Sequence, residues 1–210
     1  MLHKFIAIEG AIGAGKTTLA KMLAADLQTT LLLEEFAENP YLPAFYKDQE
    51  KHAFSLELSL LLERHQQLTG LASIQSLVES PCVSDYYFVK SLLFANINLP
   101  EDHYFLFKKL FELVTDKLAV PDLVVYLQRP VALLKQSIIK RGRIYEQSIT
   151  PSYLATIQSA YVNYFKTMKN QSVLILNIGE MDFENKKEDY RKISSLINKS
   201  YPMGITELNI

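Results

Sequence analysis

The chain has 210 residues, of which 49% are hydrophobic and 21% charged, and its formal net charge at pH 7 is −1. This length allows one domain with a substantial core, and the near-zero net charge gives no support for a surface that binds duplex nucleic acid. The single cysteine, Cys82, excludes an internal disulfide, and the sequence shows neither a signal-peptide core nor an apolar run of membrane-spanning length. We therefore expect a cytoplasmic protein without a membrane span.

The first predicted elements are a buried strand at residues 5–8, a glycine-rich turn and a helix. Gly10, Gly15, Lys16 and Thr17 match the phosphate-binding spacing G-x-x-x-x-G-K-[ST], and apolar residues recur at helical spacing after them. In such a P-loop, backbone N–H groups and the helix N-terminus face an anion, the lysine reaches the β- and γ-phosphates, and the hydroxyl can ligate Mg²⁺. The motif predicts a nucleoside triphosphate site formed by Gly10, Ala11, Ile12, Gly13, Ala14, Gly15, Lys16, Thr17 and Thr18.

Further strands and helices alternate along the rest of the chain. Short apolar runs predict strands at residues 29–35, 81–85, 122–127 and 172–178. Helical periodicity predicts helices at residues 51–78, 86–97, 101–118, 131–141, 150–169 and 184–199. Five apolar strands separated by helices predict an α/β fold, with a five-stranded parallel sheet and helices on both faces. No linker divides the chain, so residues 1–210 are predicted to form one domain.

Several classes of protein use a triphosphate site of this kind. A GTPase switch carries Asp-x-x-Gly, and no aspartate here is followed by glycine three residues later. A mechanical ATPase places four apolar residues before an acidic strand end, a pattern that residues 81–85 match poorly. A small-molecule kinase needs a cationic lid over the transferring phosphoryl group, and residues 140–148 supply Lys140, Arg141 and Arg143 around a glycine. Read alone, these cations could also be a solvated helix end.

Six segments make the sequence resemble the deoxyribonucleoside kinases, and within them the bacterial deoxyguanosine kinase type. They occur in family order over residues 5–155, and a weaker tail extends to about residue 190. The segments are "FIAIEGAIGAGKTTLA", "EEFAENPYLPAFY", "HAFSLELSLLLERHQQL", "VSDYYFVKSLLFA", "PDLVVYL" and "KRGRIYEQSITPSYL". The resemblance implies a P-loop nucleoside kinase fold with an arginine-rich lid, ATP and Mg²⁺ as cofactors, a deoxyribonucleoside acceptor, and a homodimer.

By this resemblance, Glu34 is the general base toward the 5′-hydroxyl of the sugar. The reaction needs a carboxylate there, because the hydroxyl loses its proton as its oxygen bonds to phosphorus. The adjacent Glu35 is the alternative, and the register to "NPYL" favours Glu34.

Asp85 matches the family acid near Mg²⁺, where Thr17 would be the second ligand. Many relatives have arginine directly after this acid, whereas this chain has Tyr86. A neutral phenol cannot replace a guanidinium. The lid arginines, Arg141 and Arg143, are therefore expected to stabilise the migrating phosphoryl group together with Lys16.

The substrate residues implied by the resemblance divide into sugar and base contacts. Tyr46 and Glu146 match the pair that binds the 3′-hydroxyl, one able to donate and the other to accept. Glu57 and Arg64 lie seven residues apart on one helix face, where the family has glutamine in place of Glu57. An ionised carboxylate only accepts hydrogen bonds, and guanine offers the N1–H and N2–H₂ donors side by side. Arg64 is expected to donate toward O6 or N7 of guanine, although the two charges could instead pair within the core.

Four further residues are expected to contact bases. Phe54 and Phe88 are candidates to stack on the substrate base, with plain core packing as the alternative. Asp182 and Phe183 resemble the loop that covers the adenine of the phosphate donor.

The sequence favours phosphoryl transfer from ATP to the 5′-hydroxyl of deoxyguanosine. Three alternatives remain open: a deoxyadenosine/deoxycytidine kinase, a thymidylate-type nucleotide kinase, and a nucleotide-binding regulator that lacks catalysis.

Overall fold

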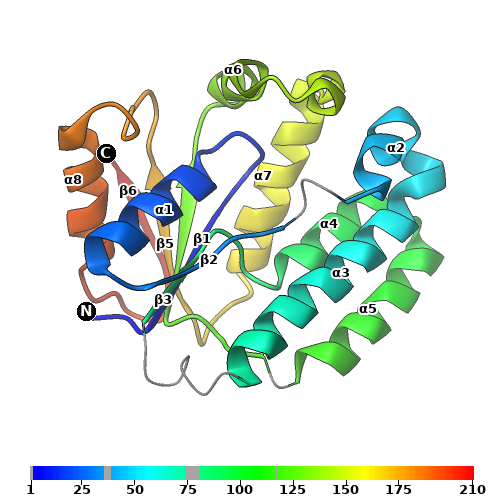
Figure 1. Ribbon diagram of the computed structural model, residues 1–210, viewed down its shortest axis with the longest axis horizontal. Helices are drawn as coiled ribbons and strands as arrows, with labels where there is room; N and C mark the ends of the chain where they lie inside the picture. The colour runs from blue at the N-terminus through cyan, green and yellow to red at the C-terminus, as the bar shows by residue number, and fades with distance from the viewer. Residues whose placement is uncertain (1, 36–38, 74–80, 117) are drawn as a thin grey trace.

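The computed structural model describes residues 2–35, 39–73, 81–116 and 118–210, and its core is a parallel sheet with the strand order β2-β3-β1-β4-β5-β6 (Figure 1). The strands are β1 (Phe5–Gly10), β2 (Thr30–Leu32), β3 (Cys82–Ser84), β4 (Leu123–Gln128), β5 (Ser172–Asn177) and β6 (Gly204–Asn209). The predicted α/β class is confirmed, but the predicted number of five strands is wrong, because β6 adds to the edge of the sheet beside β5. Side chains of β6 alternate between half-buried and exposed, so this edge strand lacks the continuous apolar run of a central parallel strand.

Helices cover both faces of the sheet, with α1 and α8 on one side and α7, α4, α3 and α5 on the other (Figure 1). They are α1 (Lys16–Leu27), α2 (Tyr41–Lys47), α3 (Gln49–Ser73), α4 (Lys90–Asn98), α5 (Glu101–Thr115), α6 (Val131–Arg141), α7 (Pro151–Phe165) and α8 (Lys187–Ile197), with a short 3₁₀ helix, η1 (Ile144–Ser148). Helix α2 was not predicted; it tolerates Pro43 in its first turn, where a missing amide N–H breaks no helical hydrogen bond.

The end of the helix predicted at 51–78 lies outside the described residues, as do positions 36–38 of the segment "EEFAENPYLPAFY". Within the described part of the chain, no helix combines the length and the apolar composition needed to cross a membrane.

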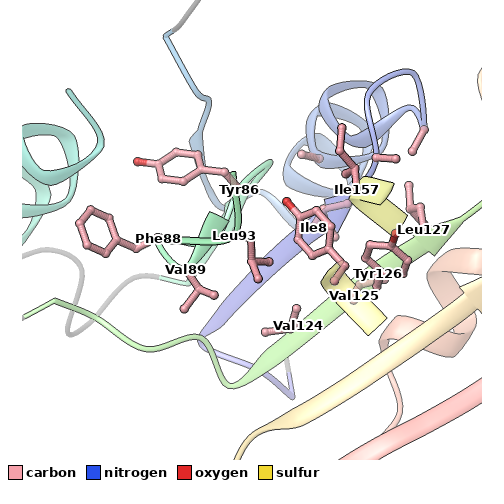
Figure 2. Close-up of a cluster of buried hydrophobic side chains, with 14 of the residues drawn as sticks. Ile8, Tyr86, Phe88, Val89, Leu93, Val124, Val125, Tyr126, Leu127 and Ile157 are labelled. Atoms are coloured by element: carbon pink, nitrogen blue, oxygen red, sulfur yellow. The ribbon is translucent and has the colours of Figure 1, made fainter. Parts of the chain in front are cut away.

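Buried side chains from β1, β4 and α7 form the centre of the core. Figure 2 shows Ile8, Val125, Tyr126 and Ile157 packed together, and all four are buried. Glu9 interrupts this apolar strand, and its carboxylate accepts hydrogen bonds of 2.7 Å from the Tyr161 hydroxyl and the Tyr87 amide. These bonds fix the carboxyl end of β1 to α7 and to the segment before α4. The P-loop, which follows directly, therefore starts from a rigid support.

Candidate active site

The carboxyl ends of β1, β2 and β3 lead into a cleft of about 730 Å³, part of which is open to solvent. The cleft gathers residues from the P-loop, three helices of the α3 side of the sheet, the lid and α7. Among the residues predicted from the sequence, those that line it are Ile12, Gly13, Lys16, Thr17, Glu34, Tyr46, Glu57, Arg64, Asp85, Arg141 and Glu146. Residues expected to serve phosphate, sugar and base thus meet in one place.

The P-loop has the backbone conformation that its glycines allow. Gly13 and Gly15 have φ angles of +85° and +94°, in the region that favours glycine, and α1 begins immediately afterwards at Lys16. The Lys16 ammonium donates to the carbonyl oxygens of Gly10 and Ala11 at 2.9 and 3.1 Å. Burial, reinforced by the nearby charge of Lys90, lowers the pKa of Lys16 to about 8. A phosphate group in the loop would favour the charged form of this lysine and give it a stronger partner than a carbonyl.

Thr17 and Asp85 form the predicted metal-binding pair. The Thr17 hydroxyl donates to one Asp85 oxygen at 2.5 Å, and the other Asp85 oxygen accepts from the Glu34 amide at 2.8 Å. Both side chains offer the oxygen ligands that Mg²⁺ prefers, and both line the cleft beside Lys16. No cluster of three metal-binding side chains occurs in the described ranges, so an ion held here would complete its shell with water and phosphate oxygens.

Glu34 is bound by two cations at the end of β2. Arg64 donates to its Oε1 atom from Nε at 2.9 Å and from Nη2 at 2.5 Å, and the Lys90 ammonium lies 2.5 Å from Oε2. Burial alone would raise the pKa of Glu34, but the charges of Lys90 and Arg64 outweigh it and lower the pKa to about 2. Glu34 is therefore ionised at neutral pH, whereas the neighbouring Glu35 is exposed and outside the cleft lining.

The contacts of Arg64 differ from those expected. Its guanidinium binds Glu34 and also donates from Nη1 to the Ser91 hydroxyl at 2.7 Å. We expected Arg64 to donate toward the substrate base, and this stays a prediction. In the structure its guanidinium pairs with Glu34 and not with Glu57, the other charge on its helix face.

Glu57 is buried, with 1% of its surface exposed, and only one of its oxygens has a partner in the described part of the chain. Oε1 accepts from Asn98 Nδ2 at 2.7 Å, and Asn98 Oδ1 in turn accepts from the Tyr153 hydroxyl at 2.8 Å. Burial raises the pKa of Glu57 to about 7. Oε2 has no hydrogen-bond donor in the described ranges, and leaving a buried carboxylate oxygen in this state is costly.

Three residues that line the cleft were not predicted from the sequence, namely Lys90, Asn98 and Tyr153. Each lies on a helix whose pattern indicated only packing. The one local signal was Lys90, a charged residue inside the apolar segment "FVKSLLFA".

In the lid, two arginines bind the same glutamate. Helix α6 ends at Arg141, and Gly142 caps it with a φ of +76°. Arg141 binds one oxygen of Glu146, and Arg143 Nη1 lies 3.2 Å from the other. The Glu146 side chain is buried and, like Tyr46 opposite it, lines the cleft. The two residues predicted to bind the sugar 3′-hydroxyl are therefore in one cavity, and the lid arginines contact the acidic member of the pair.

Phe54 and Phe88 take the packing alternative in the structure. Phe88 is buried against Phe111, with ring centroids 5.2 Å apart and an interplanar angle of 19°. Phe54 packs against the ring of His103, also at 5.2 Å. Neither residue lines the cleft, and their aromatic character is used in packing against α5. The described aromatic lining of the cleft comes from other residues, Phe45, Tyr46, Phe94 and Tyr153.

Asp182 and Phe183 lie beside the P-loop and outside the cleft lining. A Cβ atom on Gly15 would be 2.7 Å from Cζ of Phe183, so this ring rests directly on the loop. The Asp182 carboxylate accepts hydrogen bonds from the Asn185 side chain at 2.9 and 3.0 Å. The segment is therefore a firm boundary of the phosphate-binding turn.

Comparisons with known proteins agree with this arrangement. A family model described as deoxynucleoside kinase matches residues 6–201. The chain is 34% identical over 199 residues to deoxyguanosine kinase of Bacillus subtilis, covering 93% of this chain and 96% of the relative. It is 29% identical over 198 residues to deoxyadenosine kinase of Dictyostelium discoideum, covering 93% and 78% of the two chains. The structure of deoxyadenosine kinase from M. mycoides with bound dATP superposes with a TM-score of 0.79 at 25% identity, covering 94% of this chain and all of that one. With the P-loop, the acidic strand ends and the arginine lid in one cleft, these matches show that the chain belongs to the deoxynucleoside kinase family.

Proposed function

We propose that this protein transfers the γ-phosphoryl group of ATP to the 5′-hydroxyl of deoxyguanosine. The observation that carries the choice of base is the buried carboxylate of Glu57, which lines the cleft and whose Oε2 has no hydrogen-bond partner among the described residues. A carboxylate accepts hydrogen bonds from both N1–H and N2–H₂ of guanine, whereas adenine presents the N1 lone pair, an acceptor against an acceptor. The similarity to a deoxyguanosine kinase over 93% of the chain adds support.

In this proposal each end of the cleft has a separate task. The P-loop and Lys16 bind the phosphates of ATP, and Thr17 with Asp85 hold Mg²⁺, which would offset phosphate charge when bound. Glu34 accepts a hydrogen bond from the 5′-hydroxyl and so aims its oxygen at the γ-phosphorus. As the new O–P bond forms, the bond from phosphorus to the β–γ bridging oxygen breaks, its electron pair leaves with ADP, and the hydroxyl proton passes to Glu34.

A substrate screen tests the proposal. Four deoxynucleosides, dGMP and dTMP are each incubated with the protein, ATP and Mg²⁺, and ADP release is followed in a coupled assay. We expect deoxyguanosine to have the highest kcat/KM. Faster turnover of deoxyadenosine or deoxycytidine would contradict the base assignment, faster turnover of a monophosphate would indicate a thymidylate-type kinase, and ATP binding without turnover would indicate a regulator.

Replacing Glu57 by glutamine tests the base assignment more directly. Glu57→Gln replaces one carboxylate oxygen by an NH₂ donor in nearly the same volume. Guanine then loses one hydrogen-bond acceptor for its N–H groups, and adenine or cytosine gains a donor for its ring nitrogen. We expect the ratio of kcat/KM for deoxyguanosine over deoxyadenosine to fall tenfold or more, because an unmatched buried polar group costs about 1–3 kcal/mol. Glu50→Gln, on the exposed first turn of the same helix, is the control and should leave the ratio unchanged. An unaltered substrate profile in Glu57→Gln would contradict the assignment.

The quaternary structure and the location of the protein are also proposals. A homodimer is supported by the family relationship and by exposed apolar side chains on α5, namely Phe105, Leu106 and Leu113. A cytoplasmic location is supported by the single cysteine, which is buried and has no second cysteine with which to form an internal disulfide.

A further inference from the structure

The two oxygens of Glu34 are held by different cations. Arg64 takes Oε1 with two nitrogens, and Lys90 takes Oε2 with its ammonium at 2.5 Å. Lys90 is the first residue of α4 and only 9% of its surface is exposed. Its ammonium also lies 5.6 Å from the centre of the Phe94 ring, so it is enclosed between a carboxylate and an aromatic face. Burying a charged ammonium costs free energy unless the charge is paired, and here Glu34 is its partner.

Apart from Lys90 and Arg64, the predicted cations of the site contact groups other than Glu34 in the structure. Lys16 donates to carbonyl oxygens of the P-loop, and both lid arginines contact Glu146. The position directly after Asp85 contributes no charge, because the buried Tyr86 donates its hydroxyl to Gln67 at 2.9 Å. Lys90, on α4, is a cation beside Glu34 that the sequence did not predict.

We propose that Lys90 is a positioning residue for phosphoryl transfer, which holds the Glu34 carboxylate in the orientation that receives the 5′-hydroxyl. This inference rests on the proposed function. Without Lys90, Oε2 of Glu34 would lose its partner and the carboxylate could rotate about the remaining contact with Arg64. A carboxylate held this strongly is a weak base, so its main task is to accept the hydrogen bond that aligns the hydroxyl. This suits a loose transition state, in which the hydroxyl keeps its proton until late.

The test compares Lys90→Met, which keeps the length of the side chain, with Lys90→Arg, which keeps the charge. Values of kcat and KM for deoxyguanosine are measured at saturating ATP and Mg²⁺. We expect Lys90→Met to lower kcat about tenfold or more while KM changes little, because the hydroxyl is misaligned but the nucleoside still binds. Lys90→Arg, which can still bind Oε2 of Glu34, should restore most of kcat. Lys192→Met, on the exposed surface of α8, is the matched control and should behave as wild type.

Two further measurements separate positioning from a merely structural role. A crystal structure of Lys90→Met should show the Glu34 carboxylate turned away from its wild-type orientation, with the fold unchanged, whichever nucleoside is the substrate. The double variant Glu34→Gln/Lys90→Met removes both charges, so it leaves no new unpaired ion to disturb folding. If Lys90 acts through Glu34, the double variant and Glu34→Gln should have the same kcat.

An unchanged kcat in Lys90→Met, an unchanged orientation of the Glu34 carboxylate in its crystal structure, or a further loss of kcat in the double variant would overturn the inference. Failure of the proposed function would be seen differently, as wild-type protein that phosphorylates no deoxynucleoside.

Discussion

Glu34 and Glu57 line the same cleft, but their surroundings move their pKa values in opposite directions. Burial raises the pKa of Glu57 to about 7, while the charges of Lys90 and Arg64 overcome the effect of burial on Glu34 and lower its pKa to about 2. The carboxylate at the phosphate end is therefore ionised throughout the physiological range. The carboxyl group of Glu57 changes its charge near neutral pH, and with its charge it changes from acceptor to possible donor.

We expect the choice of base to depend on pH for this reason. Below pH 7 the protonated Glu57 can donate to N1 of adenine, and above pH 7 the ionised form accepts from guanine. The ratio of kcat/KM for deoxyguanosine over deoxyadenosine should therefore rise as pH increases from about 6 to 8, with a midpoint near the raised pKa. Parallel assays of both nucleosides measure it. Glu57→Gln has no proton to lose at this position, so its ratio should stay flat, and a flat wild-type ratio would show that Glu57 does not face the base.

At the scale of elements, the P-loop and the base of the lid are in direct contact. A Cβ atom on Gly13 would lie 2.6 Å from the Leu134 carbonyl oxygen and 3.1 Å from Cγ1 of Ile138, both on α6. The φ of Gly13 is +85°, so a side chain there would be strained even without this contact. The turn that binds phosphate is therefore packed against the helix that leads into the lid arginines, and neither can be displaced without the other.

Gly13→Ala should damage both folding and ATP binding. The positive φ costs about 1–2 kcal/mol for an alanine, and the overlap with α6 adds about 1–3 kcal/mol. Gly204→Ala is a matched control, because Gly204 has a φ of +94° but nothing within 4 Å of a Cβ atom. Thermal or urea unfolding should show a larger loss of unfolding free energy for Gly13→Ala, and only this variant should have a higher KM for ATP. Equal losses in the two variants would argue against close packing of the P-loop and α6.

At the scale of the whole molecule, α5 is the outermost helix of the layer that it forms with α3 and α4 (Figure 1). Its inner side buries Phe107 and Phe111, while Phe105 and Leu113 on its outer side are 60% and 78% exposed. Large apolar side chains exposed on one helix are typical of a surface that another protein covers. A second copy of this chain is the partner that the proposed homodimer requires.

Sedimentation of the purified protein tests this proposal. We expect a dimer at micromolar concentration, and a monomer for Leu113→Glu, because a carboxylate cannot be buried in an apolar interface without a partner. Met203→Glu makes the same change at a side chain that is 70% exposed and distant in sequence from α5, so this variant should remain dimeric. A monomeric wild type, or a dimeric Leu113→Glu, would place the interface elsewhere or remove it.

The sequence alone determined the features that depend on near neighbours along the chain. The P-loop, the lid and the central strands were predictable because glycine spacing, helix-capping signals and continuous apolar runs act over a few residues. Glu34 and Asp85 were also placed in the cleft correctly, since parallel strands direct their carboxyl ends to one edge, whereas Glu146 was identified through the family resemblance. Even Glu57 was identified, as a charge on an apolar helix face.

Only the tertiary structure decided which side chains face one another. Phe54, Phe88 and Phe94 are all aromatic residues on or beside helices, and no local pattern separates the one that lines the cleft from the two that pack against α5. The partners of Glu34 come from α3 and α4, thirty and fifty-six residues away in sequence. Strand β6 is held by pairing with β5 rather than by its own apolar pattern. These outcomes depend on how the helices are placed against the sheet. Contacts between residues far apart in the sequence produce no periodic pattern within either segment, so the sequence alone does not reveal them.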